Sequence, residues 1–234
     1  MFKNRIDAGD ELAQEFSHKI SSIKDLVVVG IARGGVPIAS RVAEKLNRKL
    51  DVLSIKKIKT TKQPIQTLGA VSEEGDLFLE HNAIFKYNIG SEELKLLIDK
   101  YHERARSESE MFMSEKRFVD YEDKSILLVD DGIATSSTIQ AAVMFLKKYN
   151  VKRILLASPV CSRDAWDVLN GIVDSIFVLD IQKVFSTISS SYEEFLPVSN
   201  EDVIDILSDS PTALNSKRMI EKFDNLPTDI FHFY

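Results

Sequence analysis

Two adjacent carboxylates and the hydroxyl-rich residues after them carry the strongest chemical signal of the sequence. Asp130 and Asp131 follow the apolar run Ile126–Val129, and the small polar stretch 132–138 leads into a helical pattern. In open α/β sheets, ligands bind at the carboxyl ends of the strands, and the N–H groups at a helix start bind phosphate. Carboxylates accept hydrogen bonds from sugar hydroxyls. The stretch therefore predicts a site for a molecule that contains both a sugar diol and a phosphate.

Two basic groups predict a second anion site. Arg33-Gly34-Gly35 follows a buried apolar run, and its glycines allow backbone N–H groups to approach an anion closely. Lys56-Lys57 follows the apolar segment Val52–Ile55. Each group alone also fits a plain tight turn or a solvated basic loop. Because both follow predicted strands of one sheet, we expect them at the same edge as Asp130 and Asp131.

The elements that must position these groups alternate between strands and helices. Unbroken apolar runs predict buried strands, and apolar spacings of three and four residues predict helices. This alternation is typical of a parallel α/β fold. We predict one domain over residues 1–208, followed by an extension at 209–234. The predicted strands cover 26–31, 52–55, 126–129, 153–158 and 175–179, the helices 12–23, 37–46, about 91–118, 139–146, 163–169 and 201–207, the hairpin 69–79, and the loops 56–66 and 186–191, with Asp7 or Asp10 capping the first helix.

The stretch from Val129 to Thr138 resembles the ribose 5-phosphate motif of the type I phosphoribosyltransferases. That motif is an apolar strand, two acids, and a loop that ends in Thr-Gly-x-Thr; Ser136 stands here where glycine is usual. From about Arg5 to Leu207 the chain looks like predicted bacterial phosphoribosyltransferases of undefined substrate. The resemblance implies an α/β fold: one Rossmann-like domain with a central, mostly parallel sheet flanked by helices, a hairpin and flexible-loop insertion, and a small hood.

The resemblance also implies an activity and the residues for it. Such enzymes transfer ribose 5-phosphate from 5-phosphoribosyl 1-diphosphate to a nitrogenous base, with Mg²⁺ as cofactor and pyrophosphate as product. The catalytic residues carried over are Arg33, Lys57, Asp130 and Asp131, and Mg²⁺ would be held mainly by the substrate, with Asp130 or Asp131 contacting it through water. The ribose 5-phosphate would contact Asp130, Asp131, Gly132, Ala134, Thr135, Ser136, Ser137 and Thr138, and the pyrophosphate Ala32, Arg33, Gly34, Gly35, Lys56 and Lys57.

Several alternatives stay open. Hypoxanthine-guanine enzymes have an Asp directly before the motif threonine, whereas this chain has Ala134, so those two bases are not supported. The main alternative is a non-catalytic protein that binds phosphoribosyl diphosphate or a nucleotide and regulates a partner; a hydrolase or phosphorylase-like activity is a weaker one. A receiver domain fits less well. In receiver domains the acid pair ends the first strand and a further Asp ends a later strand, whereas here the pair comes after residue 125 and Ser158 ends the next predicted strand.

The charge distribution favours a small anionic ligand. The 234 residues include 30 Lys and Arg and 36 Asp and Glu, a net charge of −6. The segment Arg33–Lys62 nevertheless has nine basic residues against two acidic ones, a net +7, which leaves −13 for the rest. We therefore expect no nucleic-acid partner, and no membrane association because the apolar runs are too short. The polar start and the single Cys161 favour the cytoplasm, and a homo-oligomer stays open.

Other reactive or aromatic residues have plainer interpretations. Base recognition in the resembled family uses the loop after the next strand, here 159–166, so Trp166 or Phe177 could stack on a base. Core positions are nevertheless expected for both. Cys161 is expected to be a small buried residue. His81, His102 and His232 show no metal-ligand spacing and are expected at the surface.

Overall fold

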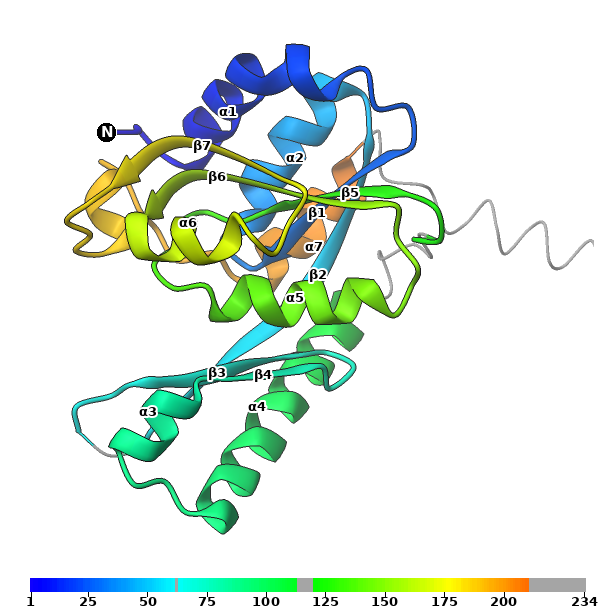
Figure 1. Ribbon diagram of the computed structural model, residues 1–234. Coiled ribbons are helices and arrows are strands. Elements are labelled where there is room, and N and C mark those ends of the chain that lie inside the picture. The colour runs from blue at the N-terminus through cyan, green and yellow to red at the C-terminus, as the bar shows by residue number, and fades with distance from the viewer. Residues whose placement is uncertain (62, 113–119, 211–234) are drawn as a thin grey trace, which may run out of the picture.

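Five parallel strands and an antiparallel hairpin form one seven-stranded sheet in this computed structural model, which describes residues 1–61, 63–112 and 120–210 (Figure 1). The order is β4-β3-β2-β1-β5-β6-β7, and only β3 and β4 run antiparallel to their neighbours. The predicted α/β class, with a mostly parallel sheet, is confirmed. The strands are β1 (Leu26–Ala32), β2 (Lys49–Lys59), β3 (Thr67–Ser72), β4 (Leu77–Leu79), β5 (Ser125–Val129), β6 (Arg153–Ser162) and β7 (Ser175–Gln182).

Helices cover both faces of the sheet. The alternation of side chains along a strand sends Val27, Val29, Ile126 and Leu128 into one apolar core, and Val28 into a second core on the other face. Strands buried on both faces need unbroken apolar runs, and this explains the patterns that predicted β1 and β5. The helices are α1 (Arg5–Ile20), α2 (Gly35–Leu46), α3 (His81–Lys86), α4 (Ser91–Phe112), α5 (Ser137–Lys147), α6 (Arg163–Leu169), η1 (Ile188–Ser191, 3₁₀) and α7 (Asn200–Asp209).

The second strand is longer than predicted, and the prediction of a loop from Lys56 is wrong for its first four residues. β2 extends to Lys59 because β3 pairs with it from Ile55 to Lys59. The hairpin β3–β4, α3 and most of α4 then form a lobe that projects from the main sheet (Figure 1). Its small core contains Ile58, Leu68 and Leu97. Long-range pairing thus gives strand structure to a lysine-rich segment that has no local strand pattern.

Several other boundaries differ from the prediction, and three of them bear on caps, loops or helix length. Asn4, not Asp7 or Asp10, caps α1, because its side chain accepts hydrogen bonds from the N–H groups of Ile6 and Asp7. β6 continues to Ser162, four residues beyond Ser158, and α6 follows at once, so no loop separates them. α4 ends at Phe112 in the described residues, and the predicted continuation at 113–118 lies outside them.

The residues after β7 form a small hood over the strand ends. This hood (residues 183–199) includes η1 and packs Tyr192 against Phe2, and the two residues form an isolated parallel bridge. The predicted extension at 209–234 lies almost wholly outside the described residues, so its boundary stays a prediction. Among the described helices, none has the length and apolar character needed to cross a membrane.

Candidate functional site

The ends of β1 and β5 bring the glycine turn and the acid pair into contact. A Cβ atom added to Gly34 would lie 2.1 Å from Asp131 Oδ2, and one added to Gly35 would lie 2.4 Å from the carbonyl oxygen of Val129. Real Cβ atoms do not approach other atoms so closely, so any side chain at either position would push the two loops apart. The peptide bond between Ala32 and Arg33, at the start of this turn, is cis. The predicted pyrophosphate and ribose segments are therefore neighbours.

Asp131 is held from two sides by residues outside the motif. Arg5, at the start of α1, donates from Nε to Asp131 Oδ2 at 2.9 Å, and its Nη2 forms an ion pair with the same oxygen at 2.7 Å. The Tyr192 hydroxyl donates to the backbone carbonyl of Asp131 at 2.6 Å. Arg5 is itself fixed by the hood, because its guanidinium lies 3.8 Å from the centre of the Phe195 ring and its Nη1 donates to the Leu196 carbonyl at 2.7 Å.

Each acid keeps one carboxylate oxygen for a ligand. Asp130 Oδ1 accepts the Asp131 N–H at 2.9 Å, and Asp131 Oδ2 accepts from Arg5. None of the hydrogen bonds found among the described residues reaches Asp130 Oδ2 or Asp131 Oδ1. Two carboxylate oxygens, one from each residue, are therefore candidates to accept hydrogen bonds from a ligand.

Burial and the adjacent carboxylate raise the pKa of Asp130 to about 8, while the charge of Lys57 opposes the shift. Burial also raises the pKa of Asp131, although Arg5 counteracts it strongly. The two acids are too close to ionise independently, so the pair as a unit holds a proton more tightly than an isolated aspartate does. Strongly shifted carboxyl groups beside a cation are typical of functional sites.

The hydroxyl-rich loop leads into the start of α5. Thr138 Oγ1 is buried and has no hydrogen-bond partner among the described residues. Ser137 Oγ donates to Glu80 Oε1 at 2.8 Å, and Thr135 is exposed. Buried polar atoms without partners are rare in proteins. An orphaned hydroxyl beside the free N–H groups of a helix start therefore fits a phosphate oxygen as its missing partner.

Ser136 occupies its position without strain. Its backbone has φ −74° and ψ −14°, which any L-residue adopts, so the glycine usual in the resembled motif is not required by backbone angles here. Ser136 Oγ accepts a hydrogen bond from Gln140 Nε2 at 2.9 Å. Nearby, the Ala134 carbonyl accepts from Ser162 Oγ at 2.9 Å, and Gly132 packs closely under Ile188 of the hood.

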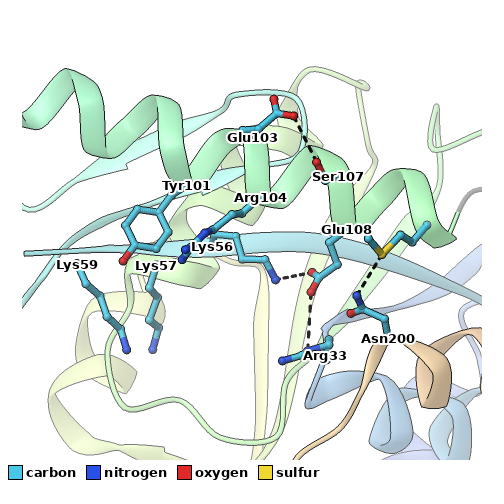
Figure 2. Close-up of a pocket in the computed structure, with 11 residues that line it drawn as sticks. Arg33, Lys56, Lys57, Lys59, Tyr101, Glu103, Arg104, Ser107, Glu108 and Asn200 are labelled. Carbon is cyan, nitrogen blue, oxygen red and sulfur yellow. Dashed lines mark hydrogen bonds and ion pairs between the residues drawn. The ribbon is translucent and has the colours of Figure 1, made fainter.

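Basic residues surround a groove between β2 and α4. The groove has a volume of about 640 Å³ and includes Arg33, Lys56, Lys57 and Lys59 in its lining. In Figure 2 the side chains of Lys57 and Lys59 extend the same way, on the side of β2 where Arg33 lies, while Lys56 turns to Glu108. Lys56 is thus engaged by Glu108, whereas Lys57 lies on the side of Arg33, and the role of Lys57 as a pyrophosphate contact stays a prediction.

Glu108 of α4 is a buried acid that the sequence interpretation missed. It accepts hydrogen bonds from Lys56 Nζ and, at 2.5 Å, from Ser54 Oγ, and Arg33 Nε lies 3.8 Å from its Oε1. Arg5 and Tyr192 were missed as well. All three residues lie far from the motif segments in the sequence and reach them only after the chain has folded. Glu108 is also one of many charged residues of α4, and its local sequence does not distinguish it from the others.

The remaining candidates have structural positions. Trp166 packs against one core and Phe177 against the other, as expected. Cys161 is buried, and burial raises the pKa of its thiol to about 12. His81 is exposed, and His102 is partly exposed with Nε2 3.3 Å from the Glu73 carbonyl oxygen. His232 lies outside the described residues. The described part of the chain contains no cluster of three or more metal-ligating side chains.

Comparison with known proteins agrees with this geometry. Residues 2–194 match the family model described as "Phosphoribosyl transferase domain", so the chain belongs to the phosphoribosyltransferase domain family. The predicted family membership is confirmed. The match covers the sheet, the acid pair, the glycine turn and most of the hood, including Arg5 and Tyr192.

Three similar proteins illustrate the relationship. A protein of Mycobacterium tuberculosis, whose name gives a phosphoribosyl transferase activity as provisional, is 29% identical over 207 residues, covering 88% of this chain but 46% of its own length. A "Bifunctional protein PyrR" of Clostridium novyi is 27% identical over 139 residues, covering 59% of this chain and 58% of its own. The crystal structure of TT1426 from Thermus thermophilus superposes with a TM-score of 0.73 at 28% identity and covers 89% of this chain and 98% of its own. The chain thus spans about half the length of the mycobacterial relative.

Proposed function

We propose that this protein is a Mg²⁺-dependent phosphoribosyltransferase that uses 5-phosphoribosyl 1-diphosphate and a nitrogenous base. The observation that carries the proposal is the contact between Gly34-Gly35 and the acid pair. It puts an anion-binding turn directly beside two carboxylate oxygens that have no partner among the described residues. A sugar that carries a diphosphate on the carbon next to its diol fits this arrangement, because its diphosphate would lie at the turn and its diol at the two carboxylates.

The proposed binding mode assigns one part of the substrate to each segment. Asp130 Oδ2 and Asp131 Oδ1 accept from the two ribose hydroxyls. The 5′-phosphate lies at the start of α5, where the orphaned Thr138 hydroxyl and the N–H groups of the loop donate to it. The diphosphate lies at the turn Ala32–Gly35, with the side chains of Arg33 and Lys57 beside it and with Lys56 held nearby by Glu108.

The acid pair also fits a magnesium ion that the substrate helps to hold. Mg²⁺ prefers oxygen ligands and is often bound by one or two carboxylates together with substrate phosphates. Asp130 and Asp131 each retain one oxygen, which is too few for a closed protein site but sufficient, directly or through water, beside a diphosphate. When bound, the ion would neutralise charge on the departing diphosphate.

In the proposed reaction, the bond between ribose C1 and the diphosphate oxygen breaks, and its electron pair leaves with pyrophosphate. A nitrogen of the base then bonds to C1 and releases its proton. Arg33, Lys57 and the turn amides stabilise the charge that develops on the leaving group, and the acid pair orients the sugar. The hood over the strand ends would restrict water, which could otherwise attack C1.

The second candidate is a regulatory protein that binds the same sugar diphosphate without turnover. Ala134 favours this candidate, because it provides no proton-accepting side chain next to the hydroxyl loop. The continuous β6 and α6 also leave no loop at 159–162 for a base, contrary to the sequence-based expectation. Both candidates use the same donor site and differ only in the fate of the diphosphate.

One experiment separates them. The protein is incubated with 5-phosphoribosyl 1-diphosphate, Mg²⁺ and a panel of nucleobases, and pyrophosphate release is measured beside calorimetric binding. Base-dependent release supports the transferase, and Mg²⁺-dependent binding without release on any base supports the regulator. No binding of the sugar diphosphate would contradict both. Asp131→Asn should abolish binding, whereas Asp164→Asn, at an exposed position on α6, is the matched control.

A further inference from the structure

The groove beside α4 is larger and more cationic than a diphosphate needs. Its volume of about 640 Å³ lies in the range of sites for drug-sized ligands. Five cationic residues and two carboxylates line it. Both carboxylates already have cationic partners: Glu108 binds Lys56, and Glu103 binds Arg106 at 2.9 Å. The uncompensated positive charge therefore lies on Lys57, Lys59 and Arg104.

The groove follows an unpaired edge of β2. The pairing of β1 with β2 ends at Ala32 and Ser54, so among the described strands the segment from Ile55 to Lys59 is paired on one edge only, with β3. Alternate side chains point to opposite faces of a strand, so Lys56 lies on one side of this edge and Lys57 on the other. The strand from Lys56 to Lys59 covers about 10 Å. A diphosphate, with two phosphorus atoms joined by one oxygen, occupies only part of that length.

Two cations extend the groove away from the pyrophosphate turn. Arg104 reaches the groove from α4, where its guanidinium lies 5.4 Å from the centre of the Tyr101 ring (Figure 2). Lys59 lies at the end of β2 and is exposed. Among the described residues, neither forms an ion pair, and neither belongs to the motif segments assigned to ribose 5-phosphate or pyrophosphate. These two residues define the outer half of the groove.

We propose that the groove binds ligands that carry a linear chain of three or more phosphates. The first phosphates take the place of the diphosphate at Arg33 and Lys57, and the next ones reach Lys59 and Arg104. The inner half of this site rests on the proposed function. Because the two sites overlap at the turn, such a ligand excludes 5-phosphoribosyl 1-diphosphate and acts as a competitive effector.

The test compares inorganic pyrophosphate with inorganic tripolyphosphate by calorimetry on the whole chain, without Mg²⁺. We expect tripolyphosphate to bind about tenfold more tightly, because each added charge-assisted contact contributes at a partly exposed site. The double variant Lys59→Gln/Arg104→Gln should lose that advantage and keep its affinity for pyrophosphate within about twofold. Both positions are exposed, so the variant should fold normally. Lys100→Gln, on the same helix but outside the groove lining, is the charge control.

Equal affinity of the unmodified protein for the two phosphates, or an equal loss of both in the double variant, would overturn the proposal. A nucleoside triphosphate distinguishes the sources of the chain. If it binds as tightly as tripolyphosphate, the protein recognises the phosphates alone. If it binds more tightly, the site also contacts the nucleoside. If it fails to compete with tripolyphosphate, the proposal of one shared site is contradicted. Binding of 5-phosphoribosyl 1-diphosphate is measured separately, so failure of the proposed function remains distinguishable from failure of this inference.

Discussion

Arg5 binds Asp131 across 126 residues of sequence, with a hydrogen bond from Nε and an ion-pair contact from Nη2 to one carboxylate oxygen. Both side chains are 11% exposed. The contact ties the first turn of α1 and the hood to the acid pair, and it turns Asp131 so that Oδ1 remains available. Arg5 is thus a positioning residue for the proposed sugar site, although it does not itself face the ligand-binding oxygen.

Replacing Arg5 should affect both stability and binding. Arg5→Gln leaves a buried carboxylate without its cation, and we expect the free energy of unfolding to fall by about 3 kcal/mol. The affinity for 5-phosphoribosyl 1-diphosphate should fall about tenfold or more, because Asp131 loses its orientation. Arg5→Lys keeps the charge but not the forked geometry, so it should recover part of the affinity. Denaturant unfolding and calorimetry measure the two effects.

Arg41→Gln is the matched control for Arg5. Arg41 also forms ion pairs with two acids, Asp10 of α1 and Glu44 of its own helix α2, but it is more exposed and lies away from the acid pair. We expect a loss of about 1 kcal/mol or less and an unchanged affinity. An Arg5→Gln variant that binds the sugar diphosphate as tightly as the unmodified protein would show that Arg5 does not position Asp131.

The glycine turn provides a steric prediction. Gly34→Ala places a Cβ atom 2.1 Å from Asp131 Oδ2, so the turn and the acid pair must separate. We expect about a hundredfold loss of affinity for the sugar diphosphate, since a displacement of about 1 Å at an aligned site can have that effect. Gly90→Ala is the control, because no atom of the described residues lies within 4 Å of its added Cβ. Similar affinities for the two variants would argue against a ligand site at the turn.

Replacing Ser136 by glycine should change ligand binding little. Its backbone angles suit any residue, and its hydroxyl contacts only Gln140 in the described structure. Ser136→Gly removes that hydrogen bond and adds backbone freedom, so stability should fall by about 1 kcal/mol. The affinity for the sugar diphosphate should change less than about threefold, which corresponds to roughly 0.65 kcal/mol. A large gain in affinity with glycine would mean that serine obstructs the phosphate.

Asp130 should make stability depend on pH in the protein without Mg²⁺ or ligand. Its pKa is about 8 in the folded state and about 3.9 in an unfolded chain. The folded state therefore holds the proton more tightly, and stability declines as the pH rises from about 4 to 8. Asp130→Asn cannot lose a proton, so its melting temperature relative to that of the unmodified protein should increase over this range and level off above it. A constant difference between pH 4 and 8 would contradict the raised pKa.

Local patterns in the sequence determined the fold class and the location of the acid pair. Unbroken apolar runs report strands buried on both faces, and the sequence of acids, small residues and helix start is complete within residues 126–139. The same reasoning located Arg33-Gly34-Gly35 and Lys57, because parallel strands bring their carboxyl ends to one edge of a sheet.

Only the tertiary structure decided which side chains hold those residues in place. Arg5, Tyr192 and Glu108 reach the site from α1, the hood and α4, and their contacts depend on how distant elements pack. The extension of β2 to Lys59 likewise depends on pairing with β3, because a lysine-rich segment has no strand preference of its own. Periodicity and short motifs indicate which side chains of a segment are buried and where that segment begins and ends. They contain no information about partners that approach from elsewhere in the chain, and those partners orient the acid pair and shape the groove.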